Sequence, residues 1–419
     1  MNQDLPASYP WIARLISIPT ESGSSNLPLI EELEQAFGEH GLEGVRTYSE
    51  DGTRANLFVT VPASDGKVTG GIVISGHTDV VPVAGQDWDS DPFEATVRGT
   101  RLYGRGACDM KAYLGVAMHL LPELIALRAA GTLRVPVHFA FSYDEEIGCV
   151  GAPSMIHEFS ARGIHPEFCV VGEPSSMRVI SAHKGAHRGR VSFTGIAKHG
   201  SLAPHGVNAT VPAAEFSVFL NDLANSWAAE GPFDSDFVVP HSTGGVNYLR
   251  AGVQYNIVAE RAELEYDFRT LPSVSTESVL ETLDAELFGP ITQRFNAAAA
   301  RAEQLAEAPA GSLVERLEIK HELLARVPGL KTADDAPLVL LAQHWLNNAA
   351  APEKVTYGTE AGQFQQAGVQ SIICGPGDIA QAHTPNEWIE LEQIRACEDF
   401  IRQIFMWAST TVERSDTQA

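Results

Sequence analysis

Five short stretches of the sequence place histidines or carboxylates directly after, or close to, an apolar run. They are Ser75–Pro82 with His77 and Asp79, Leu102–Lys111 with Asp109, Ser142–Gly148 with Asp144, Glu145 and Glu146, Val171–Pro174 with Glu173, and Ala380–Pro385 with His383. Open α/β sheets bind ligands beyond the carboxyl ends of their strands. We therefore expect several of these side chains to meet at one edge of a sheet.

In the first stretch, His77 follows an apolar run that is typical of a strand buried on both faces of a sheet. Asp79 lies two residues after His77, where its carboxylate could accept the second imidazole N–H, as metal-bound histidines require. The alternative is a surface histidine in an Asx turn. In the second stretch, Gly104 and Gly106 allow close backbone approach before Asp109, although Asp109 could equally be a helix N-cap.

The third stretch has three consecutive carboxylates after a strongly apolar segment. Asp144, Glu145 and Glu146 repel one another, and burial would raise their pKa values unless a cation is nearby. The alternative is a set of acids in the first turn of a helix. Glu173 and His383 each lie close to a proline in a loop that follows an apolar strand.

Taken together, these stretches supply two imidazoles and three carboxylates: His77, Asp109, Glu146, Glu173 and His383. This ligand set suits zinc, and Asp109 could bridge two ions. Glu145 would remain as a base that binds no metal.

The elements that must position these residues change in character along the chain. Up to about residue 183, expected strands at 56–61, 71–75, 135–143 and 168–171 alternate with helices at 29–40, 113–130 and 152–160. Half-exposed strand patterns at 188–194 and 253–269 then accompany helices at 211–223 and from Ser275. From about 317 the pattern predicts a strand, a helix at 336–347, a buried strand at 369–374 and a helix at 389–407.

This organisation predicts an α/β protein in which helices cover a mixed sheet, with an inserted α+β two-layer domain. The expected boundaries are a catalytic domain at 1–183 and 311–419, and an inserted domain at 184–310. The alanine-rich stretch 296–310 is expected to be a helix that returns the chain to the first sheet.

Composition limits the partners and the compartment. The 419 residues carry 29 Lys and Arg against 53 Asp and Glu, a net charge of −24, which disfavours nucleic acid and anionic membranes. Five scattered cysteines without a C-x-x-C pair argue against disulfides or a thiolate zinc site. With no signal-peptide pattern and no apolar run close to 18 residues, we expect a cytoplasmic protein.

The ordered series of motifs resembles a known family of hydrolases. The stretches Gly76–Asp79, Leu102–Lys111, Asp144–Glu146, Gly172–Ser175, Ala182–Gly185 and Gln381–His383 resemble the dinuclear zinc family of acetylornithine deacetylases, succinyl-diaminopimelate desuccinylases and aminoacylase-like peptidases. The resemblance spans nearly the whole chain. Within the family, Thr359–Ala361 and Cys374–His383 are most similar to the acetylornithine deacetylase branch.

The resemblance implies a role for each site residue. It implies two Zn(II) ions, with Co(II) or Mn(II) as substitutes: His77 and Glu173 on one, Glu146 and His383 on the other, and Asp109 on both. It also implies Glu145 as general base with Asp79 supporting the catalytic site. His199 would stabilise the oxyanion, and Asn256, Arg269 and Glu360 would bind substrate.

The implied reaction is removal of the acetyl group from a small N-acylated amino acid, most simply N2-acetyl-L-ornithine, by a homodimer that associates through the inserted domain. A desuccinylase, an aminoacylase or a dipeptidase of the same family is the closest alternative. A metal-dependent binding protein without catalysis would not need Glu145. A serine or cysteine hydrolase is disfavoured because no G-x-S-x-G motif is present.

Overall fold

The computed structural model describes residues 5–410, which divide into two compact units. Unit 1 comprises residues up to 182 with 330–354 and from 359 onward, and unit 2 comprises 183–329 with 355–358. The first boundary lies at the residue before the expected one. The return was expected at 311 but occurs at 330, because the strand that follows residue 317 belongs to unit 2.

Unit 1 is built on a mixed nine-stranded sheet. Its strands are β1 (Gly44–Tyr48), β2 (Ala55–Val61), β3 (Ile72–His77), β6 (Val137–Ser142), β7 (Phe168–Pro174), β8 (Ile180–His183), β13 (Leu330–Lys331), β14 (Glu353–Val355) and β15 (Gln370–Gly375). The order is β1-β2-β6-β3-β7-β15-β8-β13, with β14 beside β8. β6, β3, β7 and β15 run parallel in the centre, as their continuous apolar runs predict.

Helices cover both faces of this sheet. They are α1 (Tyr9–Ile16), α2 (Leu27–Gly38), α3 (Lys111–Ala129), α4 (Ala152–Ala161), α8 (Pro337–Trp345), α9 (Ala361–Gln366) and α10 (Leu391–Ser409), with a 3-10 turn η4 (Ile379–Gln381). Successive residues of β2 point to opposite faces, so Leu57 and Val59 join the α2 side while Phe58 packs on Phe159 of α4 at 3.7 Å between ring centroids. A small sheet of β4 (Thr96–Arg98), β5 (Arg101–Tyr103) and β16 (Trp388–Glu390) completes the unit.

Helix α3 is long and apolar enough to cross a membrane by length and composition, although the apolar runs of the sequence suggested no such segment. It packs against α1, α10 and β3 instead. Leu114, Val116 and Leu120 are completely buried there. The apolar surface of α3 is therefore used by the core of unit 1.

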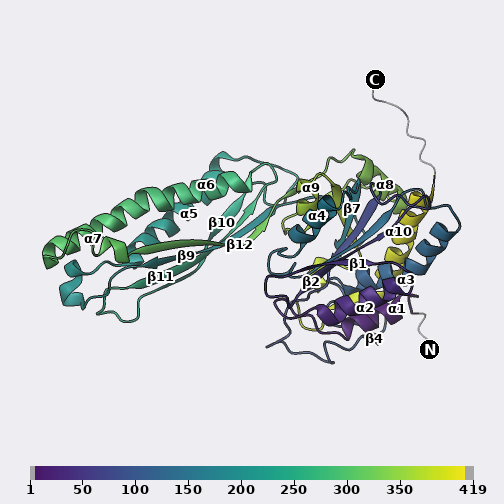
Figure 1. Ribbon diagram of the computed structural model, residues 1–419, viewed down its shortest axis with the longest axis horizontal. Coiled ribbons are helices and arrows are strands. Elements are labelled where there is room, and N and C mark those ends of the chain that lie inside the picture. The colour runs from purple at the N-terminus through teal and green to yellow at the C-terminus, as the bar shows by residue number, and fades with distance from the viewer. Residues whose placement is uncertain (1–4, 411–419) are drawn as a thin grey trace, which may run out of the picture. The chain divides into compact units, whose positions relative to one another are not determined.

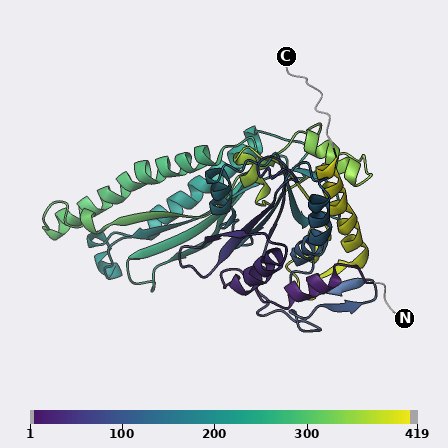
Figure 2. The same ribbon diagram turned by 45° about the vertical axis from the view of Figure 1, so that its right-hand side comes forward.

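Unit 2 is a two-layer domain. Its four-stranded antiparallel sheet has the order β10 (Thr243–Ala251), β11 (Arg261–Thr270), β9 (Gly185–Thr194) and β12 (Glu318–Val327). The helices α5 (Thr210–Glu230), α6 (Thr276–Glu286) and α7 (Thr292–Ala306) lie along one face (Figure 1), and Figure 2 shows the same layering. Two short 3-10 helices, η1 (Gly200–His205) and η3 (Val314–Arg316), and one π-helical segment, η2 (Leu287–Ile291), connect these elements.

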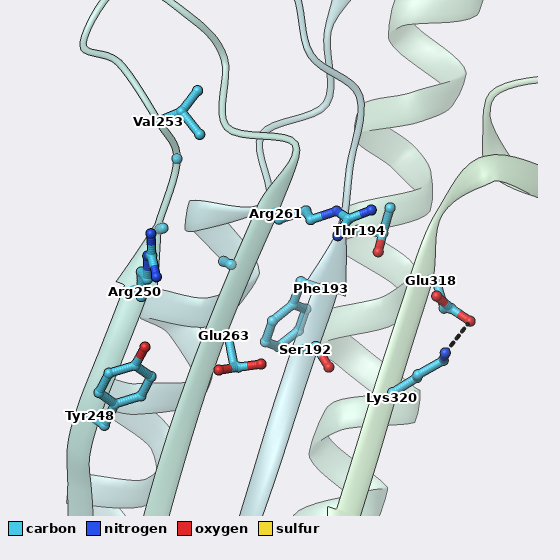
Figure 3. Close-up of a pocket in the computed structure, with 13 residues that line it drawn as sticks. Ser192, Phe193, Thr194, Tyr248, Arg250, Val253, Arg261, Glu263, Glu318 and Lys320 are labelled. Atoms are coloured by element: carbon cyan, nitrogen blue, oxygen red, sulfur yellow. Dashed lines mark ion pairs between the residues drawn. The ribbon is translucent and has the colours of Figure 1, made fainter.

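The helix-covered face of this sheet is apolar, and the other face is polar. Alternation along β9 and β11 turns Phe193 and Leu264 toward Phe216 of α5. Ser192 and Glu263 stand on the opposite face, where they help to line a hollow of about 590 Å³ (Figure 3). The two layers confirm the predicted α/β class with an inserted α+β domain.

The stretch 296–310 was expected to return the chain to the first sheet, and this was wrong. Its helical part lies in α7, and β12 then pairs with β9 along its whole length. The alternating pattern of β12 predicts a half-exposed strand but does not say which sheet accepts it.

Candidate metal centre

Three parallel strands of unit 1 bring His77, the acidic run 144–146 and Glu173 to one edge of the sheet. β3 ends at His77, β6 ends at Ser142 just before the three acids, and β7 carries Glu173 near its end. β3 pairs in parallel with both β6 and β7, with His77 opposite Ser142. The carboxyl ends of these strands therefore meet, as the sequence predicted.

Close packing of α3 on β7 fixes the position of Glu173. A Cβ atom at Gly172 would lie 2.2 Å from the ring of Tyr113. Only glycine therefore lets the buried ring of Tyr113 press against the strand at this point. Glu173 follows directly and is 4% exposed.

The first group of potential ligands consists of His77, Asp109 and Glu173, all buried. His77 Nε2 lies 2.9 Å from Asp109 Oδ1 and 3.7 Å from Glu173 Oε1. The candidate ligand atoms of the group lie within 4.8 Å of one another. An ion placed among them would have one imidazole and two carboxylate ligands.

The second group consists of Asp109, Glu146 and His383 and shares Asp109 with the first. His383 Nε2 lies 3.1 Å from Asp109 Oδ2 and 2.9 Å from Glu146 Oε2. Each oxygen of Asp109 therefore faces a different histidine, which is the geometry of a bridging carboxylate. The structure brings all five predicted ligands together.

The crowded charges shift the pKa values strongly. Hydrogen bonds to Asp109 and Glu146 raise the pKa of His383 to about 10. Burial and the charge of Asp109 raise the pKa of Glu146 to about 7. Burial alone would lower the pKa of His77, but the carboxylates of Glu173 and Asp109 raise it well above its usual value. Without a cation, the site therefore retains protons between its ligands.

Glu145 stands beside this cluster without belonging to either group. Burial and the charge of Glu146 raise its pKa to about 8, while His77 opposes the shift. The Cys149 thiol donates to Glu145 Oε1 at 3.1 Å. Asp144, the first acid of the run, pairs with Arg54 instead. Glu145 is thus a carboxylate beside the ligands that belongs to neither metal group.

The residues present fit a pair of divalent ions. Burial and the charges of Asp109 and Glu145 raise the pKa of Glu173. Its Oε1 is buried and has no hydrogen-bond partner among residues 5–410. A buried unpaired oxygen is costly, and a cation would satisfy it. The donor set of imidazole and carboxylate also suits zinc.

Asp79 supports the site in a different way from the one expected. His77 Nδ1 lies 2.8 Å from the backbone oxygen of Asp79, whereas the nearest carboxylate oxygen is 3.6 Å away. The carboxylate instead accepts the backbone N–H groups of Glu145 at 3.0 Å and Glu146 at 3.3 Å. The expected side-chain contact is therefore corrected to a backbone contact, because the side chain turns toward the acidic loop.

Glu360 was expected to bind substrate, but the structure places its carboxylate out of reach. It is completely buried, and its two oxygens accept hydrogen bonds from Ser75 of β3 and Ser142 of β6, both at 2.6 Å. Both of its oxygens are thus engaged in joining two strands. In this arrangement Glu360 supports the sheet beneath the site and does not face a ligand.

The remaining predicted residues lie in unit 2. His199 is exposed, and its Nδ1 lies 2.8 Å from Ser201 Oγ. Asn256 is its neighbour, because the Gly200 N–H donates to the Asn256 carbonyl at 2.7 Å. Arg269 is on β11, where its Nε donates to Asp267 at 3.0 Å.

Sequence reasoning missed a buried ion pair behind the metal ligands. Arg105 and Glu387 are both about 1% exposed, with 2.6 Å between Nη1 and Oε2. Arg105 lies between the two glycines that precede Asp109, and Glu387 follows His383 by four residues. Both stand in loops without periodicity, so only their proximity to predicted ligands could have singled them out.

Comparison with known proteins gives the family of the chain. Residues 73–407 match the model of peptidase family M20/M25/M40. An acetylornithine deacetylase of Proteus mirabilis is 30% identical over 412 residues, covering 96% of this chain and 97% of the relative. Another, of Myxococcus xanthus, is 28% identical over 400 residues, covering 95% of this chain and 96% of its own.

Solved structures show the same fold. An M20 family metallo-carboxypeptidase from Sulfolobus solfataricus superimposes with a TM-score of 0.68 at 17% identity, covering 98% of this chain and all of that one. A dinuclear metal-binding M20 peptidase from Bacillus subtilis gives a TM-score of 0.60 at 14% identity, covering 97% and 98%. The chain therefore belongs to peptidase family M20/M25/M40, whose members are dinuclear metal enzymes that hydrolyse amide bonds.

Proposed function

We propose that this enzyme removes the acetyl group from an N-acetylated amino acid, with N2-acetyl-L-ornithine as the first candidate substrate and ornithine and acetate as products. The observation that carries the hydrolytic part is Asp109, which presents one oxygen to each of two ligand groups while Glu145 stands beside them. The similarity to acetylornithine deacetylases over nearly the whole chain supports the substrate.

Two zinc ions would occupy the centre, one held by His77, Asp109 and Glu173 and the other by Asp109, Glu146 and His383. Such ions would supply Lewis-acid chemistry that favours deprotonation of water and polarises the acyl oxygen. Cobalt or manganese could substitute, since the ligands are imidazole and carboxylate.

Glu145 provides the proton transfers of the reaction. Its carboxylate accepts a proton from the attacking water and later donates it to the nitrogen of the departing amine. Burial and the charge of Glu146 raise the pKa of Glu145 in the absence of a cation, and two bound cations would favour the ionised carboxylate that accepts the proton. His199 is proposed to stabilise the oxyanion, and Asn256 and Arg269 to hold the substrate.

We also propose a cytoplasmic homodimer that associates through unit 2. Five free buried cysteines fit a reducing compartment. The edge strand β10 and the loop after it expose apolar side chains, with Val253 81% and Tyr255 99% exposed. Light scattering of the wild type and of a Tyr255→Asp variant tests this part; a monomeric wild type would contradict it.

The substrate is tested with protein that has been stripped with EDTA and reloaded with Zn²⁺ or Co²⁺. Initial rates are compared for N-acetylornithine, N-succinyl-diaminopimelate, N-acetylmethionine and a set of dipeptides. We expect the highest kcat/KM with N-acetylornithine. A higher value with another member of the panel would reassign the enzyme as a desuccinylase, aminoacylase or dipeptidase. Full activity in verified metal-free protein would contradict the metal mechanism.

A further inference from the structure

The backbone at Asp109 is held in place by the buried carboxylate of Glu387. Glu387 Oε1 accepts the backbone N–H groups of Cys108 at 2.7 Å and Asp109 at 3.0 Å. Its Oε2 accepts from Arg105 Nη1 at 2.6 Å and from the Gly106 N–H at 3.1 Å. Four donors converge on one side chain that is 1% exposed. The backbone of the bridging ligand is thus fixed by hydrogen bonds that leave its carboxylate free.

The same network reaches the loop that carries His383. Arg105 Nη2 donates to Gln86 Oε1 at 2.6 Å, and Gln86 Nε2 donates to the His383 carbonyl at 3.1 Å. The backbone oxygen of Glu387 also accepts from Gly104 N at 3.1 Å. Hydrogen bonds therefore join the loop that contains Asp109 to the loop that contains His383 and Glu387, although Asp109 and Glu387 lie more than 270 positions apart in the sequence.

The other ligands depend on different supports. His77 ends the central strand β3, and Glu173 belongs to β7. The backbone N–H of Glu146 donates to Asp79 at 3.3 Å. The hydrogen bonds of Glu387, Arg105 and Gln86 therefore hold two of the three ligands in the second group, Asp109 and His383. In the first group, with His77, they hold only the shared Asp109.

We propose that Glu387 is a positioning residue that sets the separation of Asp109 and His383 and thereby strengthens binding of the metal ion held with Glu146. A carboxylate accepts hydrogen bonds at both oxygens and donates none, which matches four converging donors. An amide at this position would turn an NH₂ group toward two of those donors and leave them unpaired. This inference rests on the proposed pair of metal ions, but not on the substrate or the reaction.

The experiment measures metal binding without substrate. Metal-free wild-type protein and Glu387→Gln are titrated with Zn²⁺ in equilibrium dialysis and with Co²⁺ followed by its visible absorption spectrum. We expect two ions per wild-type chain. In Glu387→Gln, one ion should remain close to wild-type affinity and the other should weaken about 10- to 100-fold, the range seen when residues that orient metal ligands are altered.

Glu390→Gln is the matched control. Glu390 also pairs with an arginine, since Arg101 Nε donates to it at 2.8 Å, but this pair is partly exposed on the small sheet. The control should bind both ions as the wild type does. Thermal unfolding of the metal-free proteins should show that Glu387→Gln is folded.

Gln86→Ala keeps the inference testable if Glu387→Gln does not fold. Gln86 is partly exposed, and its removal breaks the link between Arg105 and His383 together with the hydrogen bond that Trp88 Nε1 donates to Gln86 Oε1 at 3.2 Å. A milder loss confined to the same ion supports the proposal. Equal weakening of both ions, or no weakening, overturns the positioning role alone. A wild-type chain that binds fewer than two ions overturns this inference and the two-metal mechanism together.

Discussion

His77 Nδ1 lies 2.8 Å from the backbone carbonyl of Asp79, while the Asp79 carboxylate turns away to the loop that carries Glu145 and Glu146. The main chain of Asp79 therefore fixes the tautomer of the histidine, since a carbonyl only accepts and Nδ1 must carry the proton. Nε2 remains free to bind a metal ion. The side chain of the same residue positions the acidic loop.

Because the main chain of Asp79 contacts His77 and its side chain holds the acidic loop, we expect Asp79→Asn to affect catalysis more than binding of the ion at His77. The backbone contact to His77 survives, so the affinity for the zinc ion bound with His77 should change little. One oxygen acceptor for the loop is lost, and kcat should fall roughly 10- to 100-fold because Glu145 is no longer held firmly. Ser22→Ala, which removes a donor to the same carboxylate at 2.7 Å, serves as a mild control. A loss seen mainly in zinc affinity would show that the carboxylate acts through His77.

Glu145→Gln should separate proton transfer from metal binding. The amide has nearly the same shape but cannot accept the proton, so kcat should fall about 10²- to 10⁴-fold. Metal content, measured by atomic absorption, should stay near two ions per wild-type and variant chain alike. Near-normal turnover in the variant would remove Glu145 from its proposed role.

Glu360→Leu should act on stability and not on substrate affinity. The change leaves the hydroxyls of Ser75 and Ser142 without their carboxylate acceptor in a fully buried place, which costs roughly 1–3 kcal/mol for each unpaired group. Urea unfolding should show this loss in the free energy of unfolding. The KM of the folded variant should stay within about twofold of the wild-type value. A large rise in KM with unchanged stability would restore Glu360 as a substrate ligand.

His138 should contribute a pH dependence to stability that is independent of the metal centre. Its ring bridges Thr60 Oγ1 and the Gly70 carbonyl, both at 2.9 Å, and burial lowers its pKa to about 4. The unfolded chain takes up this proton near pH 6.5, whereas the folded chain takes it up only near pH 4. The stabilisation is therefore complete above about pH 6.5 and is lost as the pH falls toward 4.

The loss attributable to His138 should reach about 3 kcal/mol across this range. Urea unfolding of metal-free protein between pH 7 and 4.5 should show a flatter profile for His138→Gln than for the wild type. His157→Gln, an exposed histidine of α4, is the control and should follow the wild type. Parallel profiles for all three proteins would contradict the prediction.

The sequence by itself determined the central strands and the residues placed at their ends. The continuous apolar runs of β3, β6 and β7 indicate strands buried on both faces, and parallel strands bring their carboxyl ends to one edge. The sequence alone therefore predicts that His77 and Glu173 lie together. The two-layer character of unit 2 also follows from local alternation along β9 and β11.

Only the tertiary structure decided which partners those residues meet. The pattern of β12 fits either sheet, and pairing with β9 was settled by the strand edge available to it. Whether the side chain or the carbonyl of Asp79 faces His77 depends on one backbone turn. Glu387 and Arg105 lie in loops more than 280 positions apart, and only the folded chain buries them as a pair. Local sequence patterns record periodicity, whereas such contacts depend on how distant loops pack together.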